Sequence, residues 1–240
     1  MRVAIVTGGS RGIGRAVAER LAADGQAVVV AYASNESEAS ATVAAIEKAG
    51  GQAITAQVDV GDEAAVAALF ATAEDRFGGV DVVVNAAGVM RLAPLASLEV
   101  ANLDQMYRTN IRGAFLVARE AARRVREGGA IINFSTSVTR LRQPTYSGYA
   151  ASKAAMEVLS PILAKELAGR DVTANTVAPG PTATALFLDG KDQQTIDRIA
   201  GMNPMGRLGE PADIAEVVAF LAGPGRWING QTIFTNGGVA

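Results

Sequence analysis

The residues of this sequence best suited to acid–base chemistry are Tyr149 and Lys153, which stand four positions apart in a stretch with helical periodicity. This spacing places the phenol and the ammonium on one face of a helix. An ammonium stabilises a nearby phenolate, so we expect Lys153 to lower the pKa of Tyr149 from the ordinary phenol value of about 10. The chain has no histidine and no cysteine, which excludes imidazole and thiolate catalysis, disulfides and ordinary zinc or iron–sulfur sites.

A glycine-rich segment near the N-terminus has the composition of a phosphate-binding loop. It reads Thr7-Gly8-Gly9-Ser10-Arg11-Gly12-Ile13-Gly14, follows a predicted strand and opens a predicted helix. Glycines let the turn tighten and let backbone N–H groups approach a pyrophosphate, which the helix N-terminus then faces. The spacing differs from the usual Gly-x-Gly-x-x-Gly, so a merely tight strand–helix turn is the alternative. The loop predicts a dinucleotide site that includes Gly8, Ser10, Arg11, Gly12, Ile13 and Gly14.

The end of the second predicted strand indicates which nicotinamide cofactor this loop would hold. An acidic residue there would bind the adenosine ribose 2′-hydroxyl, but the sequence reads Ala31-Tyr32-Ala33-Ser34-Asn35. Ser34 and Asn35 can donate hydrogen bonds to a 2′-phosphate, and Arg11 can add a charge-assisted contact. We therefore expect NADP(H) in preference to NAD(H). In the alternative, Arg11 is a solvated charge and Glu36, one residue further on, binds a 2′-hydroxyl.

Seven short apolar runs alternate with six amphipathic stretches and must position these residues. The runs are continuous rather than alternating, as expected of strands covered on both faces, and lie at 3–7, 27–32, 53–58, 80–85, 130–134, 173–177 and 232–234. The helical patterns lie at 14–23, 37–49, 63–77, 102–127, 149–168 and 211–221. This order predicts an α/β Rossmann fold, a doubly wound seven-stranded parallel sheet with helices on both faces. No linker divides the chain, so we expect one domain over 1–240.

Residues 180–209 are rich in Gly, Pro and Thr and lack a strong period, which is typical of a functional loop. Their apolar residues, among them Leu186, Phe187 and Met202, predict a substrate lid suited to an aromatic or acyl ketone. The formal net charge of −2 argues against a nucleic-acid or anionic-membrane partner. No apolar run approaches the roughly 18 residues of a membrane span and no signal peptide is evident, so we expect a cytoplasmic protein.

Further motifs complete a pattern over essentially the whole chain. They are Asn85-Ala86-Ala87-Gly88, Asn110, the hydroxyl cluster at 135–137, Tyr149-x-x-x-Lys153 and Pro179-Gly180. With the glycine loop, their order and spacing resemble the short-chain dehydrogenase/reductase family. The chain resembles the single-domain branch that includes 3-oxoacyl-carrier-protein reductases and fungal naphthol reductases.

The resemblance implies a role for each matching residue. Tyr149 would be the general acid in carbonyl reduction, Lys153 would hold the nicotinamide ribose hydroxyls, and Asn110 would order a water that relays protons to Lys153. Asn85 would line the cofactor, although a purely structural role is the alternative. The other implied cofactor contacts are Tyr32, Asp59, Val60, Ala86, Gly88, Pro179, Gly180, Thr182 and Thr184.

The resemblance also implies a catalytic hydroxyl that binds the substrate oxygen, and three candidates are adjacent. The usual spacing of 13 residues before the tyrosine gives Thr136. The local pattern Ser-Val-Thr instead favours Ser137, 12 residues before Tyr149, if the loop is shorter by one residue. We predict Ser137, with Ser135 and Thr136 as the alternatives.

These features predict an NADPH-dependent carbonyl reductase, reversible as an alcohol dehydrogenase, that acts on small-molecule ketones or 3-oxoacyl-type substrates. The alternatives are an NAD-dependent sugar or alcohol dehydrogenase and a cofactor-sensing regulator, although such regulators typically lose the tyrosine or the lysine. Six arginines between 108 and 126 would suit an acyl-carrier partner or form a solvated helix face. Members of this branch are usually homotetramers, and we expect the same assembly here.

Overall fold

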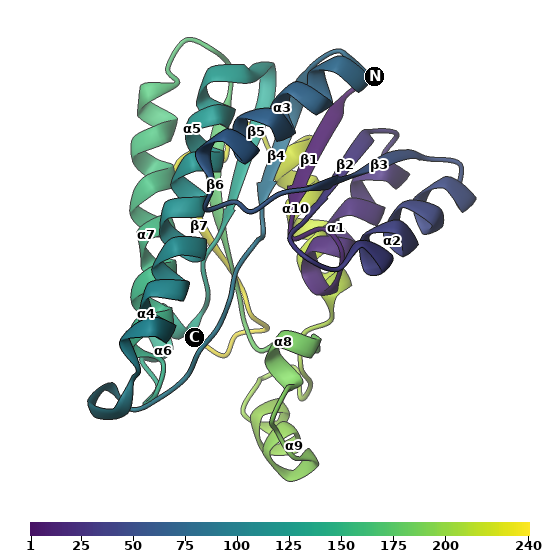
Figure 1. The fold of residues 1–240 in the computed structure, drawn as a ribbon. Helices are drawn as coiled ribbons and strands as arrows, with labels where there is room; N and C mark the ends of the chain where they lie inside the picture. Colours follow the sequence, from purple (N-terminus) through teal and green to yellow (C-terminus); the bar gives the residue numbers. More distant parts are fainter.

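A parallel sheet of seven strands runs through the middle of the computed structural model, which describes residues 1–240 (Figure 1). The strand order is β3-β2-β1-β4-β5-β6-β7, so β2 and β3 extend the sheet on one side of β1 and β4 to β7 extend it on the other. The strands are β1 Val3–Thr7, β2 Ala27–Tyr32, β3 Gln52–Gln57, β4 Val80–Asn85, β5 Val125–Phe134, β6 Thr173–Pro179 and β7 Thr232–Thr235. The predicted doubly wound sheet is confirmed. Such a switch of sides places a ligand crevice at the carboxyl ends of the strands.

Helices cover both faces of the sheet (Figure 1). One apolar core joins the sheet to α1 (Gly12–Ala23), α2 (Glu36–Lys48) and α10 (Pro211–Ala222). The other joins it to α3 (Glu63–Phe77), α5 (Ala114–Arg124) and α7 (Ser147–Glu166). Shorter elements are the 3₁₀ turn η1 Leu95–Ser97, α4 Val100–Met106, the π-helical segment η2 Tyr107–Gly113, α6 Val138–Leu141, α8 Ala185–Leu188 and α9 Gln193–Gly201. None of the helices has both the length and the apolar character needed to cross a bilayer.

Strand β1 shows why its sequence is apolar without alternation. Ala4 and Val6 lie in the core under α1 and α10, whereas Val3 and Ile5 lie in the core under α3 and α5. Successive side chains of a strand point to opposite faces, and here both faces are buried. All four side chains are inaccessible to solvent. Because β1 is packed on both faces, it fixes the position at which the glycine loop begins.

The helix predicted over 102–127 is wrong in two respects. It is interrupted by the π-helical segment η2, which contains Asn110, and α5 ends at Arg124. Val125 instead pairs with Val80 and opens β5, which therefore begins before the predicted strand at 130–134. Val125 is almost fully buried, and its β-branched side chain suits a strand better than a helix end. The wider turns of a π segment often mark functional positions.

We expect Gly14→Ala to lower the free energy of unfolding by at least about 2 kcal/mol, because overpacking at a rigid backbone contact is costly. A Cβ at Gly14 would lie 2.1 Å from Gly8 O. Gly201, at the end of α9, has open space around the same position and provides the matched control. Urea unfolding of both variants measures the difference. Equal stabilities of Gly14→Ala and Gly201→Ala would contradict this account of the loop.

Candidate active site

A cavity of about 660 Å³ lies where the carboxyl ends of the strands meet the loops that follow them. Glycine-loop residues, the end of β2, the turn after β4, the hydroxyl cluster and the start of α7 all line it. The structure gathers here every predicted site residue except Asn85 and Asn110. The lining residues among the predictions are Gly8, Ser10, Arg11, Gly12, Ile13, Gly14, Tyr32, Ser34, Asn35, Asp59, Val60, Ala86, Gly88, Ser137, Tyr149, Lys153, Pro179, Gly180, Thr182 and Thr184.

The glycine loop forms a cradle with the shape and donors that a pyrophosphate requires. Gly8 and Gly12 have φ angles of +67° and +54°, the left-handed region that favours glycine. Helix α1 starts directly after Arg11, whose side chain does not cap it, and its first turn contains no acidic residue. The first N–H groups of a helix lack partners within the helix and carry its positive end, so they remain available to an anion. The loop therefore fits the diphosphate of a dinucleotide.

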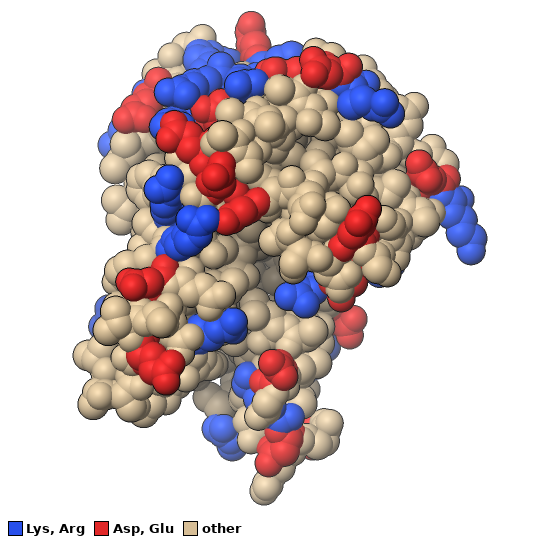
Figure 2. Space-filling view, viewed as in Figure 1, with Lys and Arg blue, Asp and Glu red and all other residues tan.

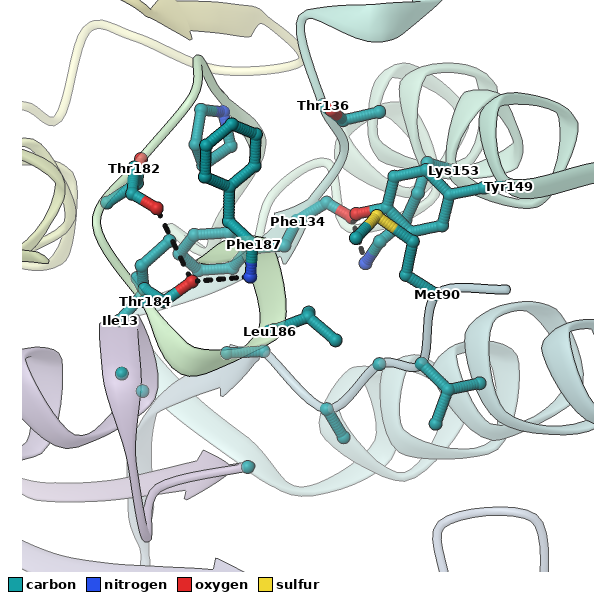
Figure 3. A pocket seen from close by; sticks show the side chains of 18 of the residues that line it. Ile13, Met90, Phe134, Thr136, Tyr149, Lys153, Thr182, Thr184, Leu186 and Phe187 are labelled. Carbon is teal, nitrogen blue, oxygen red and sulfur yellow. Dashed lines mark hydrogen bonds between the residues drawn. The ribbon is translucent and has the colours of Figure 1, made fainter. Parts of the chain in front are cut away.

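Tyr149 and Lys153 lie on α7 and face the same side of the cavity (Figure 3). Lys153 is only 6% exposed, and its Nζ donates one hydrogen bond, of 3.0 Å, to Phe134 O. An ammonium has three donors, so two remain for a ligand in the cavity. This arrangement fits the hydroxyls of a nicotinamide ribose.

Burial controls the protonation of both groups. It raises the pKa of Tyr149 to about 12, an effect that the neighbouring Tyr146 increases and a hydrogen bond with Thr136 opposes. Burial also lowers the pKa of Lys153 to about 8. The predicted lowering of the Tyr149 pKa is therefore wrong for the protein's own groups, because burial is the largest cause of the shift and raises this pKa. At neutral pH the phenol keeps its proton and the ammonium keeps its charge.

The three candidate hydroxyls point in different directions. Ser135 Oγ donates to Glu157 Oε1 at 2.6 Å. Ser137 Oγ donates to Ala178 O at 3.3 Å and accepts from Asn236 Nδ2 at 3.1 Å, which directs it to the C-terminal segment. Thr136 Oγ1 accepts from Val138 N at 3.4 Å, and a side-chain interaction of Thr136 with Tyr149 lowers the pKa of that phenol. All three residues line the cavity, so the choice of Ser137 stays a prediction, and the interaction of Thr136 with Tyr149 supports the alternative at the usual family spacing.

Asn110 and Asn85 lie behind the cavity wall and hold it in place. Asn110 Oδ1 accepts from Val89 N at 2.9 Å, and Asn110 Nδ2 donates to Val89 O at 2.8 Å and to Ser152 Oγ at 3.0 Å. These bonds fix the turn after β4 next to Lys153. Asn85 Nδ2 donates to Ala114 O at 3.1 Å and to Asn133 Oδ1 at 3.3 Å. These contacts fit the alternative of a structural role for Asn85, and its role toward the cofactor stays a prediction.

The opposite end of the cavity carries the groups expected near adenosine. Asn35 Oδ1 caps α2 by accepting from Glu38 N at 3.2 Å, which leaves the Asn35 amide N–H groups free of the cap. Asp59 accepts from Gly61 N at 2.8 Å and pairs with Arg108. Burial alone would raise the pKa of Asp59, but these two contacts outweigh it and hold that pKa below its ordinary value. Arg11 and Ser34 are exposed at the rim.

Sequence reasoning missed several residues that line the cavity. They include Glu38, Met90, Val138, Leu141, Gln143, Tyr146 and Val239. The ring of Tyr146 meets that of Tyr149 edge to face at 6.4 Å, and its place one helical turn before Tyr149 was a usable signal. Val239 carried no such signal, because only folding of the C-terminal segment brings it to the cavity. Asn203 Nδ2 holds that segment by donating to Asn236 O at 2.9 Å.

The segment 180–209 forms α8 and α9, which extend below the sheet at the mouth of the cavity (Figure 1). Of its apolar residues, Leu186, Phe187, Ile199 and Met202 line the cavity. Thr184 packs against the glycine loop, since a Cβ at Gly12 would lie 3.3 Å from Thr184 Cγ2. The segment therefore contacts both the phosphate cradle and the apolar end of the site.

The arginines between 108 and 126 do not form a free basic patch. Basic and acidic side chains are interspersed over the upper surface in Figure 2. Glu120, which is almost fully buried, pairs with Arg123 and Arg124. The other four bind within the chain, as Arg108–Asp59, Arg112–Gly61 O, Arg119–Glu63 and Arg126–Asp81. These pairs favour the interpretation of a solvated helix face over a docking site for an acidic carrier.

Comparison with known proteins shows which family the chain resembles. A family model described as enoyl-(acyl carrier protein) reductase matches residues 8–240. A short-chain type dehydrogenase/reductase of Picea abies is 45% identical and covers 99% of this chain and 92% of its own length. An NADPH-dependent aldehyde reductase-like chloroplastic protein of Arabidopsis thaliana is 43% identical, with 99% and 93% covered. The structure of a short chain dehydrogenase from Burkholderia cenocepacia in complex with NADP matches with a TM-score of 0.93 and 38% identity, covering 99% and 97%.

We expect the Lys153 ammonium to titrate at about pH 8, well below the ordinary lysine value, because burial disfavours its charge. The chain has four lysines, Lys48, Lys153, Lys165 and Lys191, so NMR of protein with ¹³C at the lysine ε-carbon can follow each signal. Lys153→Arg removes one signal and so assigns it. A titration of that signal above pH 10 would contradict the burial of this group.

Proposed function

The chain belongs to the short-chain dehydrogenase/reductase family and is an NAD(P)-dependent oxidoreductase, and we propose that it is an NADPH-dependent carbonyl reductase, reversible as an alcohol dehydrogenase. One observation carries the proposal. A phenol that keeps its proton at neutral pH lies in the cavity with a buried ammonium and the Thr136 hydroxyl on the same side. Carbonyl reduction requires an acid at this position, and Tyr149 is in the acid form.

The bound nicotinamide would supply the hydride. The chain's own residues do the rest: the glycine loop and the start of α1 hold the diphosphate, and Lys153 holds the ribose hydroxyls. Tyr149 donates its proton to the substrate oxygen. Thr136 donates a hydrogen bond to the same oxygen, where negative charge develops as the carbonyl is reduced. Asn110 positions the turn beside Lys153. We propose that it also orders a water that relays protons to Lys153.

Preference for NADP(H) is supported by the donors at the adenosine end. Arg11, Ser34 and the amide of Asn35 can bind a 2′-phosphate, and none of the three is an acid. Glu36, the alternative partner for a 2′-hydroxyl, is exposed and does not line the cavity. The NADPH-dependent Arabidopsis relative and the NADP complex from Burkholderia add support.

The apolar end of the cavity favours ketones with an aromatic or acyl group. Met90, Leu141, Leu186, Phe187 and Met202 line it, and flexible methionines accommodate several ligand shapes. A free sugar would find few hydrogen-bonding partners there, so the NAD-dependent sugar dehydrogenase is the weaker candidate. Retention of both Tyr149 and Lys153 disfavours a cofactor-sensing regulator.

We also propose a homotetramer, as expected from the family. Large apolar side chains are exposed on adjoining helices η2, α5 and α7, at Tyr107, Phe115, Val158 and Ile162, and elsewhere at Phe220 and Trp227. Such exposure on several faces is typical of surfaces covered by other subunits. A cytoplasmic location stays a prediction, since the Arabidopsis relative is chloroplastic by name.

A ketone panel tests the proposal most broadly. We expect oxidation of NADPH faster than of NADH with aryl ketones or an acetoacetyl thioester, and little turnover with sugars. Tyr149→Phe should reduce turnover at least about 100-fold, the scale of general acid catalysis, while NADPH still binds. Faster turnover with NADH, or full activity of Tyr149→Phe, would contradict the proposal.

A second pair of variants tests the hydroxyl. We expect Thr136→Val, which keeps the side-chain shape, to lower kcat about 100-fold with little change in NADPH binding, because one oxyanion-type donor is lost. Ser137→Ala should retain kcat within about fivefold, since its hydroxyl bonds Ala178 O and Asn236 instead. A larger loss of kcat in Ser137→Ala than in Thr136→Val would instead identify Ser137 as the catalytic hydroxyl.

A further inference from the structure

Glu38 is the only acidic side chain besides Asp59 that lines the cavity, and the proposed reaction does not use it. It lies in the first turn of α2, beside Asn35, whose side chain accepts from Glu38 N. Its Oε2 is buried and has no hydrogen-bond partner, and its carboxylate forms no ion pair. A buried carboxylate oxygen without a donor is costly, so a group that donates to it is expected.

The helix directs this carboxylate toward the glycine loop. Thr42 stands four residues after Glu38, so the two share one face of α2. Thr42 Oγ1 lies 3.0 Å from Glu38 O and 3.3 Å from Ser10 O, which ties this face to the loop. Helical side chains also tilt toward the helix N-terminus, and at α2 that end adjoins Ser34 and Asn35. Glu38 therefore faces the same end of the cavity as the proposed 2′-phosphate donors.

Asp59 differs from Glu38 in that its charge is already balanced. It accepts from Gly61 N and pairs with Arg108, whereas Arg11, the cation within the glycine loop, forms no ion pair in the structure. The adenosine end thus combines hydrogen-bond donors suited to a phosphate with one unneutralised acceptor suited to a hydroxyl. A site built for 2′-phosphate alone would not need that acceptor.

We propose that Glu38 sets the cofactor selectivity of this chain by accepting a hydrogen bond from an adenosine ribose 2′-hydroxyl and opposing a 2′-phosphate. This inference rests on the proposed cofactor site. Glu38 then moderates the preference that Arg11, Ser34 and Asn35 create, so that NAD(H) is accepted alongside NADP(H). The acid lies six residues beyond the end of β2, in a helix, which is why the sequence around the strand end did not reveal it.

Glu38→Gln tests the inference, with Glu36→Gln as its matched control. Both variants remove one negative charge from the first turn of α2, but Glu36 is exposed and does not line the cavity. Calorimetry with adenosine 2′,5′-bisphosphate and with 5′-AMP, which differ only in the 2′-phosphate, measures selectivity without turnover. NADPH and NADH binding, followed by their fluorescence, repeats the comparison with whole cofactors.

In Glu38→Gln we expect the ratio of affinities to shift about fivefold toward the 2′-phosphorylated ligand, the scale of one partly screened charge pair. In Glu36→Gln the ratio should shift by less than about twofold, and added salt should reduce the Glu38→Gln effect. An unchanged ratio in Glu38→Gln, or equal shifts in both variants, would overturn the role of Glu38. Failure of the wild type to bind NADPH or either nucleotide would overturn the proposed function, and this inference with it.

Discussion

The contact between Lys153 Nζ and Phe134 O links the fold to the chemistry. A buried ammonium is costly, and this one has a single hydrogen-bond partner within the protein. Strand β5 must end where its last carbonyl meets α7, and the turn after β4 must leave room beside it. A Cβ at Gly88 would lie 3.3 Å from both Lys153 Nζ and Asn110 Oδ1, so a larger residue there would crowd both groups. The rest of the site is arranged around this buried charge.

Burial also sets the protonation states from which the proposed reduction starts. The same surroundings that lower the pKa of Lys153 raise that of Tyr149, so the two groups are a charged ammonium and a neutral phenol at neutral pH. A neutral phenol is an acid, as reduction requires. Oxidation of an alcohol would require the phenolate, which burial disfavours. The protein's own electrostatics therefore keep Tyr149 in the protonated form that reduction uses, and a phenolate for the reverse reaction would have to form against the effect of burial.

Much of this site could be predicted from the sequence, because its main parts are local. The glycine loop, the i, i+4 pair and the apolar strands each depend on a few neighbouring residues. The direction of the Ser137 hydroxyl could not be predicted, since it depends on Asn236, 99 residues away. Glu38 and Val239 reach the cavity only through the packing of α2 and of the C-terminal segment. The end of α5 was missed because Val125 pairs with Val80 across the sheet, and this pairing overrides the helical pattern.

The central claim is that Tyr149 acts as a neutral acid next to a buried ammonium. The pH dependence of kcat for carbonyl reduction tests it most directly, with the NADPH and ketone concentrations saturating at every pH. We expect a plateau through neutrality and a fall above about pH 8, as Lys153 loses its proton while Tyr149 keeps its own. A reduction rate that instead rises with pH between 7 and 9, as a required phenolate would produce, would contradict the account.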